Sequence, residues 1–297
     1  MSIKKLLPFI AALIFSGSGF AQDFKKQFTA LNAAKDTAGQ IKLLREWEQK
    51  TPEDPELYVS YYSYYVWKSK MACLVFRKSK PKKSNLLVRP DTATGRMVDE
   101  GLYDPGYLQK GFAYTDKGIQ KFPDRLDLRF GKIYMLGETK DYQALTEEIL
   151  KTIDYSAKNK NAWLWSDNVP KKDGKDFFLE GIQNYVVQLY NTNDDALLEN
   201  MKQISERVLK YYPGRVEALS NVATVYLMRK QYDKALKPLQ KAENLAPTDF
   251  VVLSNIAQVY KEKGDKPNAV KYYELTLKYG DADAKKAAQD ELDALKK

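Results

Sequence analysis

Adjacent acids are the residues of this chain with the clearest capacity for chemistry. Glu147-Glu148 and Asp194-Asp195 supply paired carboxylates, the residue type that carries out general acid and base steps in glycoside hydrolysis. The sequence has no histidine, which excludes Ser-His-Asp and Cys-His nucleophiles and nearly all zinc, copper and non-haem iron sites. Carboxylate chemistry, Ser-Lys pairs and oxygen-ligated calcium or magnesium remain.

None of these remaining chemistries has a motif in the sequence. Acidic pairs are expected by chance among 39 acidic residues, and the chain lacks a glycine-rich phosphate loop, a nucleophile elbow and a calcium loop. We interpret the acidic pairs as solvated helix faces and caps. The prediction is therefore a protein that is not an enzyme, with no catalytic residue, no cofactor and no metal site; a carboxylate-based hydrolase is the alternative.

A single cysteine, Cys73, precludes an internal disulfide. It lies in the apolar run Met71–Phe76, which favours a buried, inert thiol over a reactive or crosslinked one. Stability must then come from apolar packing.

Basic residues gather in one segment of the chain. The net charge is +9, and it falls to +7 without Lys4 and Lys5. Eight basic residues and no acid occur between positions 68 and 89: Lys68, Lys70, Arg77, Lys78, Lys80, Lys82, Lys83 and Arg89. The segment is either a solvated loop or, through Arg77, Lys78, Lys80, Lys82 and Lys83, a contact for an acidic protein or an anionic glycan. Nucleic acid is not expected as a partner, because aromatic residues do not alternate with these basic side chains.

A repeat near the C-terminus defines the elements that position the remaining candidates. Five residues recur 34 positions later: Ala223, Tyr226, Ala235, Leu239 and Pro247 correspond to Ala257, Tyr260, Ala269, Tyr273 and Asp281. Leu219, Val222, Ala223 and Tyr226 form one helical stripe, and the alanines are small where two helices of a hairpin would cross. A period of 34 is typical of a helix–turn–helix solenoid.

At residues 216–280 the chain resembles the tetratricopeptide repeat family. The stretches Asp116–Pro123 and Leu128–Tyr134 are also similar to uncharacterised secreted proteins of this family. The resemblance implies an all-α, right-handed superhelix of helical hairpins, an α-solenoid, that binds a partner protein or peptide in its concave groove.

The prolines that end helices, among them Pro52, Pro123 and Pro213, indicate the domain organisation. Their spacing exceeds whole periods twice, which predicts two loop insertions. The predicted segments are N-terminal helices in 22–54, degenerate hairpins in 55–213 with insertions near 71–106 and 155–176, two well-formed repeats in 214–281, and a capping helix in 282–297.

Residues 1–21 have the pattern of an export signal. Lys4 and Lys5 precede the apolar run Leu6–Phe15, and Gly19-Phe20-Ala21 offers a small-x-small cleavage site. The run is shorter than the roughly 20 residues of a membrane span. We predict an exported protein of the periplasm or cell surface with no transmembrane span in the mature chain; an uncleaved anchor is the alternative.

Candidate binding residues follow from the repeat phase. The first helix of each hairpin would face the concave groove with Ser220, Asn221, Thr224, Met228, Ser254, Asn255, Gln258 and Lys285. Trp163 and Trp165 lie in the second insertion, outside the repeat. Exposed and parallel, they would favour the further alternative of a glycan-handling protein of the cell envelope.

Overall fold

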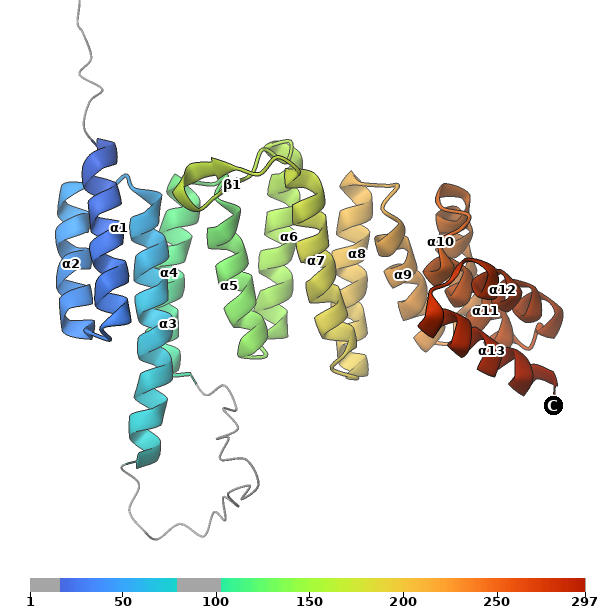
Figure 1. The fold of residues 1–297 in the computed structure, drawn as a ribbon. Helices are drawn as coiled ribbons and strands as arrows, with labels where there is room; N and C mark the ends of the chain where they lie inside the picture. The colour runs from blue at the N-terminus through green and yellow to red at the C-terminus, as the bar shows by residue number, and fades with distance from the viewer. Residues whose placement is uncertain (1–16, 79–102, 297) are drawn as a thin grey trace, which may run out of the picture. The chain divides into compact units, whose positions relative to one another are not determined.

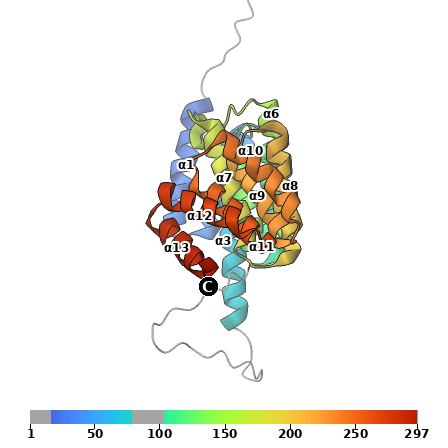
Figure 2. The ribbon, with the colours of Figure 1, turned by 90° about the vertical axis from the view of Figure 1, so that its right-hand side faces the viewer.

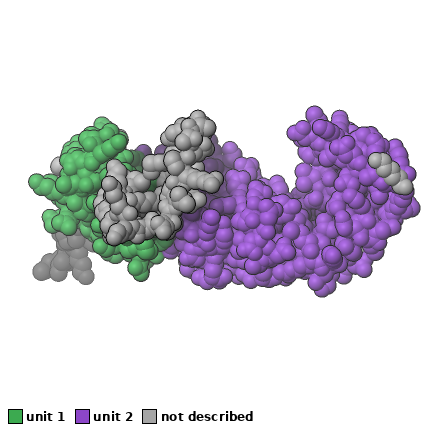
Figure 3. All heavy atoms as spheres, turned by 90° about the horizontal axis from the view of Figure 1, so that it is seen from below, with its two compact units in different colours: residues 1–123 green, residues 124–297 purple. Residues whose placement is uncertain are grey.

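The computed structural model describes residues 17–78 and 103–296. In this part of the chain the fold is all-α, apart from one ribbon of two short strands (Figure 1). The chain divides into two compact units, Met1–Pro123 and Asp124–Lys297 (Figure 3). The fold class predicted from the repeat is confirmed: consecutive helices pack pairwise as hairpins.

The described residues of the first unit form four helices: α1 (Gly17–Ala33), α2 (Thr37–Lys50), α3 (Pro55–Lys78) and α4 (Pro105–Lys121). Its core is aromatic. The indole of Trp47 is fully buried and stacks on Phe24 with ring centroids 5.5 Å apart, while its Nε1 donates a 3.0 Å hydrogen bond to Asp54. Tyr61 on α3 stacks on Tyr114 of α4 at 3.8 Å between centroids. Aromatic stacking and the hydrogen bonds between Ser69 of α3 and Asp104, the N-cap of α4, hold this hairpin together.

The first predicted insertion, 71–106, is shorter than expected. Helix α3 continues to Lys78, and α4 already begins at Pro105, where Asp104 caps it by accepting a hydrogen bond from the amide of Tyr107. Residues 79–102 lie outside the described part of the chain.

The second unit begins with α5 (Leu126–Glu138) and α6 (Tyr142–Lys158), followed by the second insertion. This insertion is also shorter than the predicted 155–176, because α6 runs to Lys158 and α7 begins at Gly174. It folds into an antiparallel ribbon of β1 (Leu164–Trp165) and β2 (Val169–Pro170), joined by the short helix η1 (Ser166–Asn168).

A buried arginine ties this ribbon to the second unit. Arg125 is fully buried, and its guanidinium donates to both carboxylate oxygens of Asp127 at 2.8 and 2.7 Å. It also reaches Asn168 of η1 at 3.3 Å, and the amide of Leu164 donates to the carbonyl of Asp124 at 2.9 Å. Because the charged pair is hydrogen-bonded on several sides, the insertion is held in place.

Three hairpins then follow in one phase. They are α7 (Gly174–Tyr190) with α8 (Leu198–Tyr211), α9 (Val216–Met228) with α10 (Tyr232–Leu245), and α11 (Phe250–Lys263) with α12 (Lys266–Tyr279); the short helix η2 (Asp195–Leu197) precedes α8. Helices α8, α10 and α12 each have 14 residues, and their first residues are 34 positions apart. The regular array therefore starts one hairpin earlier than the two repeats predicted in 214–281.

Alanine occupies the helix crossings in this array. Ala223 and Ala235 are buried in the core shared by α9, α10 and α11, and Ala257 and Ala269 are buried in the next. Helix α13 (Ala282–Lys296) covers the last hairpin by packing against α12, as expected of a capping helix (Figure 2).

The turns between paired helices use one backbone conformation with different residues. Gly264 ends α11 with φ +81°, a left-handed conformation that costs glycine little. Lys230, 34 residues earlier, adopts φ +56° at the same point of the preceding hairpin. The repeat thus imposes its turn geometry even where no glycine is available.

Enlarging a crossing alanine tests the repeat phase. We expect Ala223→Phe and Ala257→Phe to destabilise the fold by about 1–3 kcal/mol through overpacking, which lowers the melting temperature by several degrees at about 2–4 °C per kcal/mol. Ala287→Phe, at an exposed position of α13, is the control and should melt like the parent in a thermal circular dichroism scan. Equal melting of all three variants would contradict the assigned crossings.

Candidate functional site

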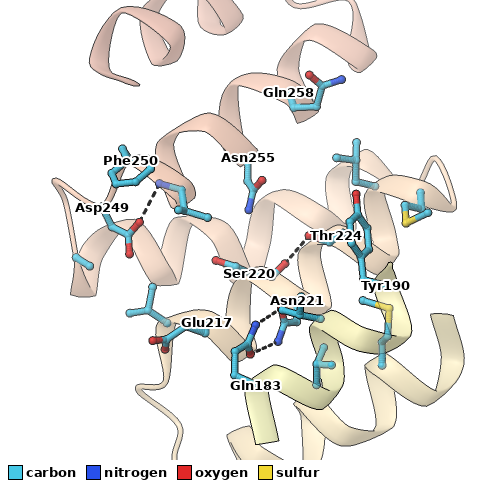
Figure 4. A pocket seen from close by; sticks show the side chains of 18 of the residues that line it. Gln183, Tyr190, Glu217, Ser220, Asn221, Thr224, Asp249, Phe250, Asn255 and Gln258 are labelled. Atoms are coloured by element: carbon cyan, nitrogen blue, oxygen red, sulfur yellow. Dashed lines mark hydrogen bonds between the residues drawn. The ribbon is translucent and has the colours of Figure 1, made fainter. Parts of the chain in front are cut away.

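A groove of about 790 Å³ opens in the second unit between α7, α9 and α11 (Figure 4). These are the first helices of three successive hairpins, so residues 34 positions apart take equivalent places along it. Its lining comprises Gln183, Val186, Val187, Tyr190, Met201, Val216, Glu217, Ser220, Asn221, Thr224, Leu227, Met228, Ala246, Thr248, Asp249, Phe250, Val251, Asn255 and Gln258.

Most of the groove residues expected from the sequence come together here. Six line the groove: Ser220, Asn221, Thr224, Met228, Asn255 and Gln258. Ser254 is half-buried on α11 and Lys285 is exposed on α13, both away from the lining. Neither residue belongs to the lining of this groove, so the structure does not place them with the other six. Whether the six bind a partner stays a prediction.

Helix α7 supplies one wall that sequence reasoning missed. Gln183, Val187 and Tyr190 lie 34 positions before Glu217, Asn221 and Thr224 of α9. Counting back 34 residues from the groove positions of α9 could have located them. The preceding insertion and the change of residue type at each position hid this copy of the repeat.

Two side-chain amides join α7 to α9 in the groove. The Asn221 amide donates to Gln183 Oε1 at 2.8 Å, and the Gln183 amide donates back to Asn221 Oδ1 at 3.3 Å (Figure 4). This reciprocal pair uses one donor and the acceptor oxygen of each amide. It fixes both side chains and leaves one N–H of each for other contacts.

The equivalent position one repeat later is left open. Asn255 corresponds to Asn221, and Glu217 corresponds to Gln183. Glu217 turns to Arg215 instead, with 2.8 Å between its carboxylate and the guanidinium Nε. Within the described residues the half-buried side-chain amide of Asn255 has no hydrogen-bond partner. It therefore offers both a donor and an acceptor to a ligand.

A buried hydroxyl adds a second unused polar group. Ser220 lines the groove and is only 7% exposed, and its Oγ has no hydrogen-bond partner in the described structure. Its carbonyl accepts from the Thr224 hydroxyl at 3.0 Å. Buried polar groups are normally paired, and Ser220 is the one residue of the groove lining among the three described residues with an unpaired buried side-chain atom; the others are Trp163 and Ser205.

Exposed apolar side chains also concentrate in the groove. Eight large hydrophobic residues are exposed in the described part of the chain, and four of them line it: Val187, Tyr190, Met228 and Val251. Each is between 42% and 50% exposed. Clustered rather than scattered, such residues mark an interaction surface.

The groove carries little net charge. Its lining includes two acids, Glu217 and Asp249, and no basic residue. Glu217 is paired with Arg215, and Asp249 caps α11 by accepting from the amides of Val251 and Val252 at 2.9 and 3.3 Å. Recognition here depends on apolar contact and neutral hydrogen bonds.

Trp163 and Trp165 do not form the exposed, parallel pair that the glycan-handling alternative requires. Trp163 is 1% exposed and packs between Tyr155 and Phe178, because the second insertion folds back onto the unit as a ribbon. It is a core residue, and its assignment as a partner-binding residue was wrong. Trp165 is half-buried, lies edge-on to Phe177, and has the Lys171 ammonium 4.9 Å from its ring centroid.

The acids near the second insertion serve structural roles. Asp124 accepts from Tyr155 at 2.9 Å, and Asp127 is bound by Arg125. Glu148 is buried and pairs with Lys132 at 3.1 Å, so it is not the solvated residue expected from the sequence, whereas Asp194 caps η2 as expected. In the described ranges no three His, Cys, Asp or Glu side chains gather as a metal site.

The basic segment lies largely outside the described residues. Lys80, Lys82 and Lys83 fall in 79–102, and the side chains of Arg77, Lys78 and Cys73 are outside the described part as well. Their predicted roles stay predictions.

A smaller cleft of about 410 Å³ lies between α5 and α7. Phe130, Tyr134, Phe177 and Tyr185 give it aromatic walls. Burial raises the pKa of Tyr185 to about 12, and its hydroxyl donates to the carbonyl of Phe130 at 3.4 Å. Phe130 also meets Trp165, Phe177 and Phe178, which makes this cleft the surface of an aromatic cluster.

Solved structures with a similar arrangement are tetratricopeptide repeat proteins. YrrB, described as having an unusual peptide-binding site, is 11% identical with a TM-score of 0.42, covering 83% of this chain and 97% of its own. A tetratricopeptide repeat protein from Parabacteroides merdae is 10% identical with a TM-score of 0.35, covering 93% and 99%. Yeast Tom70 is 16% identical with a TM-score of 0.34, covering 98% and 67%.

No family model and no curated protein sequence matches the chain. At the identities and TM-scores above, the structural similarities carry no information about what the chain binds. The chain is similar to tetratricopeptide repeat structures in its helical hairpins, and its function has to be argued from its own groove.

The two equivalent asparagines give a matched test of the groove. We expect Asn221→Ala to lower stability by about 0.5–1.5 kcal/mol, because it removes the reciprocal bonds to Gln183. Asn255→Ala removes no hydrogen bond and should leave the melting temperature within about 1 °C of the parent. Thermal scans of both variants decide the matter, and a larger loss for Asn255→Ala would contradict the assignment of its amide as unused.

Proposed function

We propose that this protein is a non-catalytic binding scaffold that holds a peptide segment of a partner protein in the groove between α7, α9 and α11. The observation that carries the proposal is the pair of unused polar groups, the Asn255 amide and the Ser220 hydroxyl, inside a groove with exposed apolar walls. Without hydrogen-bond partners, these two groups contribute little to the stability of the fold. A peptide satisfies them while it covers apolar surface.

The competing functions have less support. Asp124, Asp127 and Glu148, which lie near the second insertion, are ion-paired or hydrogen-bonded, so these three carboxylates are engaged in the fold and are poor candidates for hydrolysis. A glycan platform loses Trp163 to the core. The groove therefore supports binding better than either alternative.

We also propose that the protein is exported. The support is the sequence pattern of residues 1–21; residues 1–16 lie outside the described part, and α1 begins at Gly17. Of the helices in the described ranges, none combines the length and apolarity needed to cross a bilayer.

Site-specific crosslinking tests the binding function. A benzophenone amino acid placed at Met228, in the groove, should capture a partner in the cell that makes the protein, because this side chain is exposed between the two walls. The same amino acid at Ala287 on α13 is the control and should capture little. Mass spectrometry of the products identifies the partner and the captured peptide.

Two results would contradict this proposal. One is crosslinking from Ala287 with none from Met228. The other is hydrolysis of an ester, peptide or glycoside substrate by the purified protein that a single Asp or Glu substitution abolishes.

Export has its own test. We expect the mature protein to begin near Gln22, since signal peptidase cleaves after small residues such as Ala21. N-terminal sequencing of the protein from fractionated cells measures this, with Ala21→Arg as a variant that should remain uncleaved. A mature chain that keeps residues 1–21 in the cytoplasmic fraction would disprove export.

A further inference from the structure

We propose that the groove selects an extended peptide carrying two apolar side chains about five residues apart, with few acidic residues between them. This inference rests on the proposed peptide-binding function and specifies its ligand. It comes from the distribution of apolar and polar side chains along the groove.

One end of the groove is apolar where α7 and α9 finish. Val187 and Tyr190 come from α7 and Met228 from α9, and all three side chains are exposed. Leu227 and the buried Met201 lie behind them. This end forms a first pocket for an apolar anchor.

The other end is apolar where α9 and α11 begin. Val251 is 50% exposed, and Phe250 and Val216 beside it are half-buried. Ala246, in the connection that leads to α11, completes this second pocket. Because equivalent first helices of a repeat array run in the same direction, the beginnings of α9 and α11 lie together, opposite the end that holds Tyr190 (Figure 4).

Between the two ends the groove is polar and uncharged. Ser220, Asn221, Thr224 and Asn255 occupy this centre (Figure 4). Of these four, Ser220 through its hydroxyl and Asn255 through its side-chain amide lack a hydrogen-bond partner among the described residues. A ligand that spans both apolar ends must therefore pass over groups that demand hydrogen bonds.

The spacing of the ends sets the length of the ligand. Val216 and Met228 mark the two ends of α9 and are twelve residues apart, which is about 18 Å along a helix. An extended peptide advances about 3.3 Å per residue and covers this distance in about five residues. A helical ligand would need its anchors about twelve residues apart.

The polar centre favours the extended form. An extended backbone presents a free N–H and C=O at every residue, which matches the amide of Asn255 and the hydroxyl of Ser220. A helix satisfies its backbone internally and would bury these groups without partners.

Charge limits the ligand further. The Val251 end contains the carboxylates of Glu217 and Asp249, and no base lines any part of the groove. An acid in the peptide near this anchor would approach two carboxylates, of which, in the described part of the chain, only Glu217 is paired with a cation, Arg215. Basic residues are tolerated there.

Selection from a random twelve-residue peptide library displayed on phage tests the inference. Clones are kept when they bind the parent protein but do not bind the Asn255→Ala variant. Ser254→Ala, on the same helix, is the matched control and should bind the same clones as the parent. We expect the retained peptides to share two apolar residues separated by four to six positions, with few acids between them.

A synthetic fluorescent peptide from this selection then tests the two ends separately. Replacing either apolar residue by Ser, or inserting two residues between them, should weaken binding at least tenfold by fluorescence polarisation. Tyr190→Ser should weaken binding of the parent peptide but should not further weaken the peptide in which the anchor for the Tyr190 end is already Ser. Val251→Ser should likewise not further weaken the peptide that lacks the anchor for the Val251 end. Circular dichroism confirms that each variant is folded.

The outcomes separate this inference from the function on which it rests. Peptides that need Asn255 but carry a single anchor, or anchors about twelve residues apart, would overturn the extended two-anchor ligand and leave peptide binding standing. A selection in which no peptide depends on any groove residue would overturn both.

Discussion

The close approach of helices at alanine crossings is the constraint on which the regular part of this protein depends. Ala223, Ala235, Ala257 and Ala269 are all at most 1% exposed, and each sits where a larger side chain would push two helices apart. The hairpins therefore stack with one repeated geometry. That geometry is strong enough to hold Lys230 in the backbone conformation that Gly264 adopts one repeat later.

A repeated geometry converts sequence spacing into position in space. Residues 34 apart on α7, α9 and α11 become equivalent along one groove, so each position is presented three times with a different side chain. Gln183, Glu217 and Val251 occupy one such set, and the groove changes from amide to acid to apolar along it. The chemistry of the groove thus varies from helix to helix while the scaffold stays constant, as a stack of repeats permits.

The sequence predicted the features that depend on local residue spacing, but it did not predict those that depend on contacts between distant segments. The alanine phase predicted the hairpins and placed Asn221, Asn255 and four neighbours in one groove, because helical periodicity is a local property. The ribbon at 164–170 depends on the buried Arg125 and its bond to Asp127, a contact that no periodicity reveals. Trp163 was misjudged for the same reason: residues in an insertion have no phase, and only the folded ribbon shows which of them become core.

The contrast between Asn221 and Asn255 shows how a repeat protein keeps one site structural and frees the next. The asparagine is the same in both repeats. The residue at the matching position on the first helix of the preceding hairpin is an amide, Gln183, in one case and a carboxylate, Glu217, in the other. Gln183 can return a hydrogen bond and closes the pair. Glu217 can only accept, and the guanidinium of Arg215 holds it with a charge-assisted bond that a neutral amide cannot match. The structure thus pairs Asn221 with Gln183, whereas Glu217, the equivalent of Gln183, pairs with Arg215 and the Asn255 amide lies in the groove without a hydrogen-bond partner among the described residues.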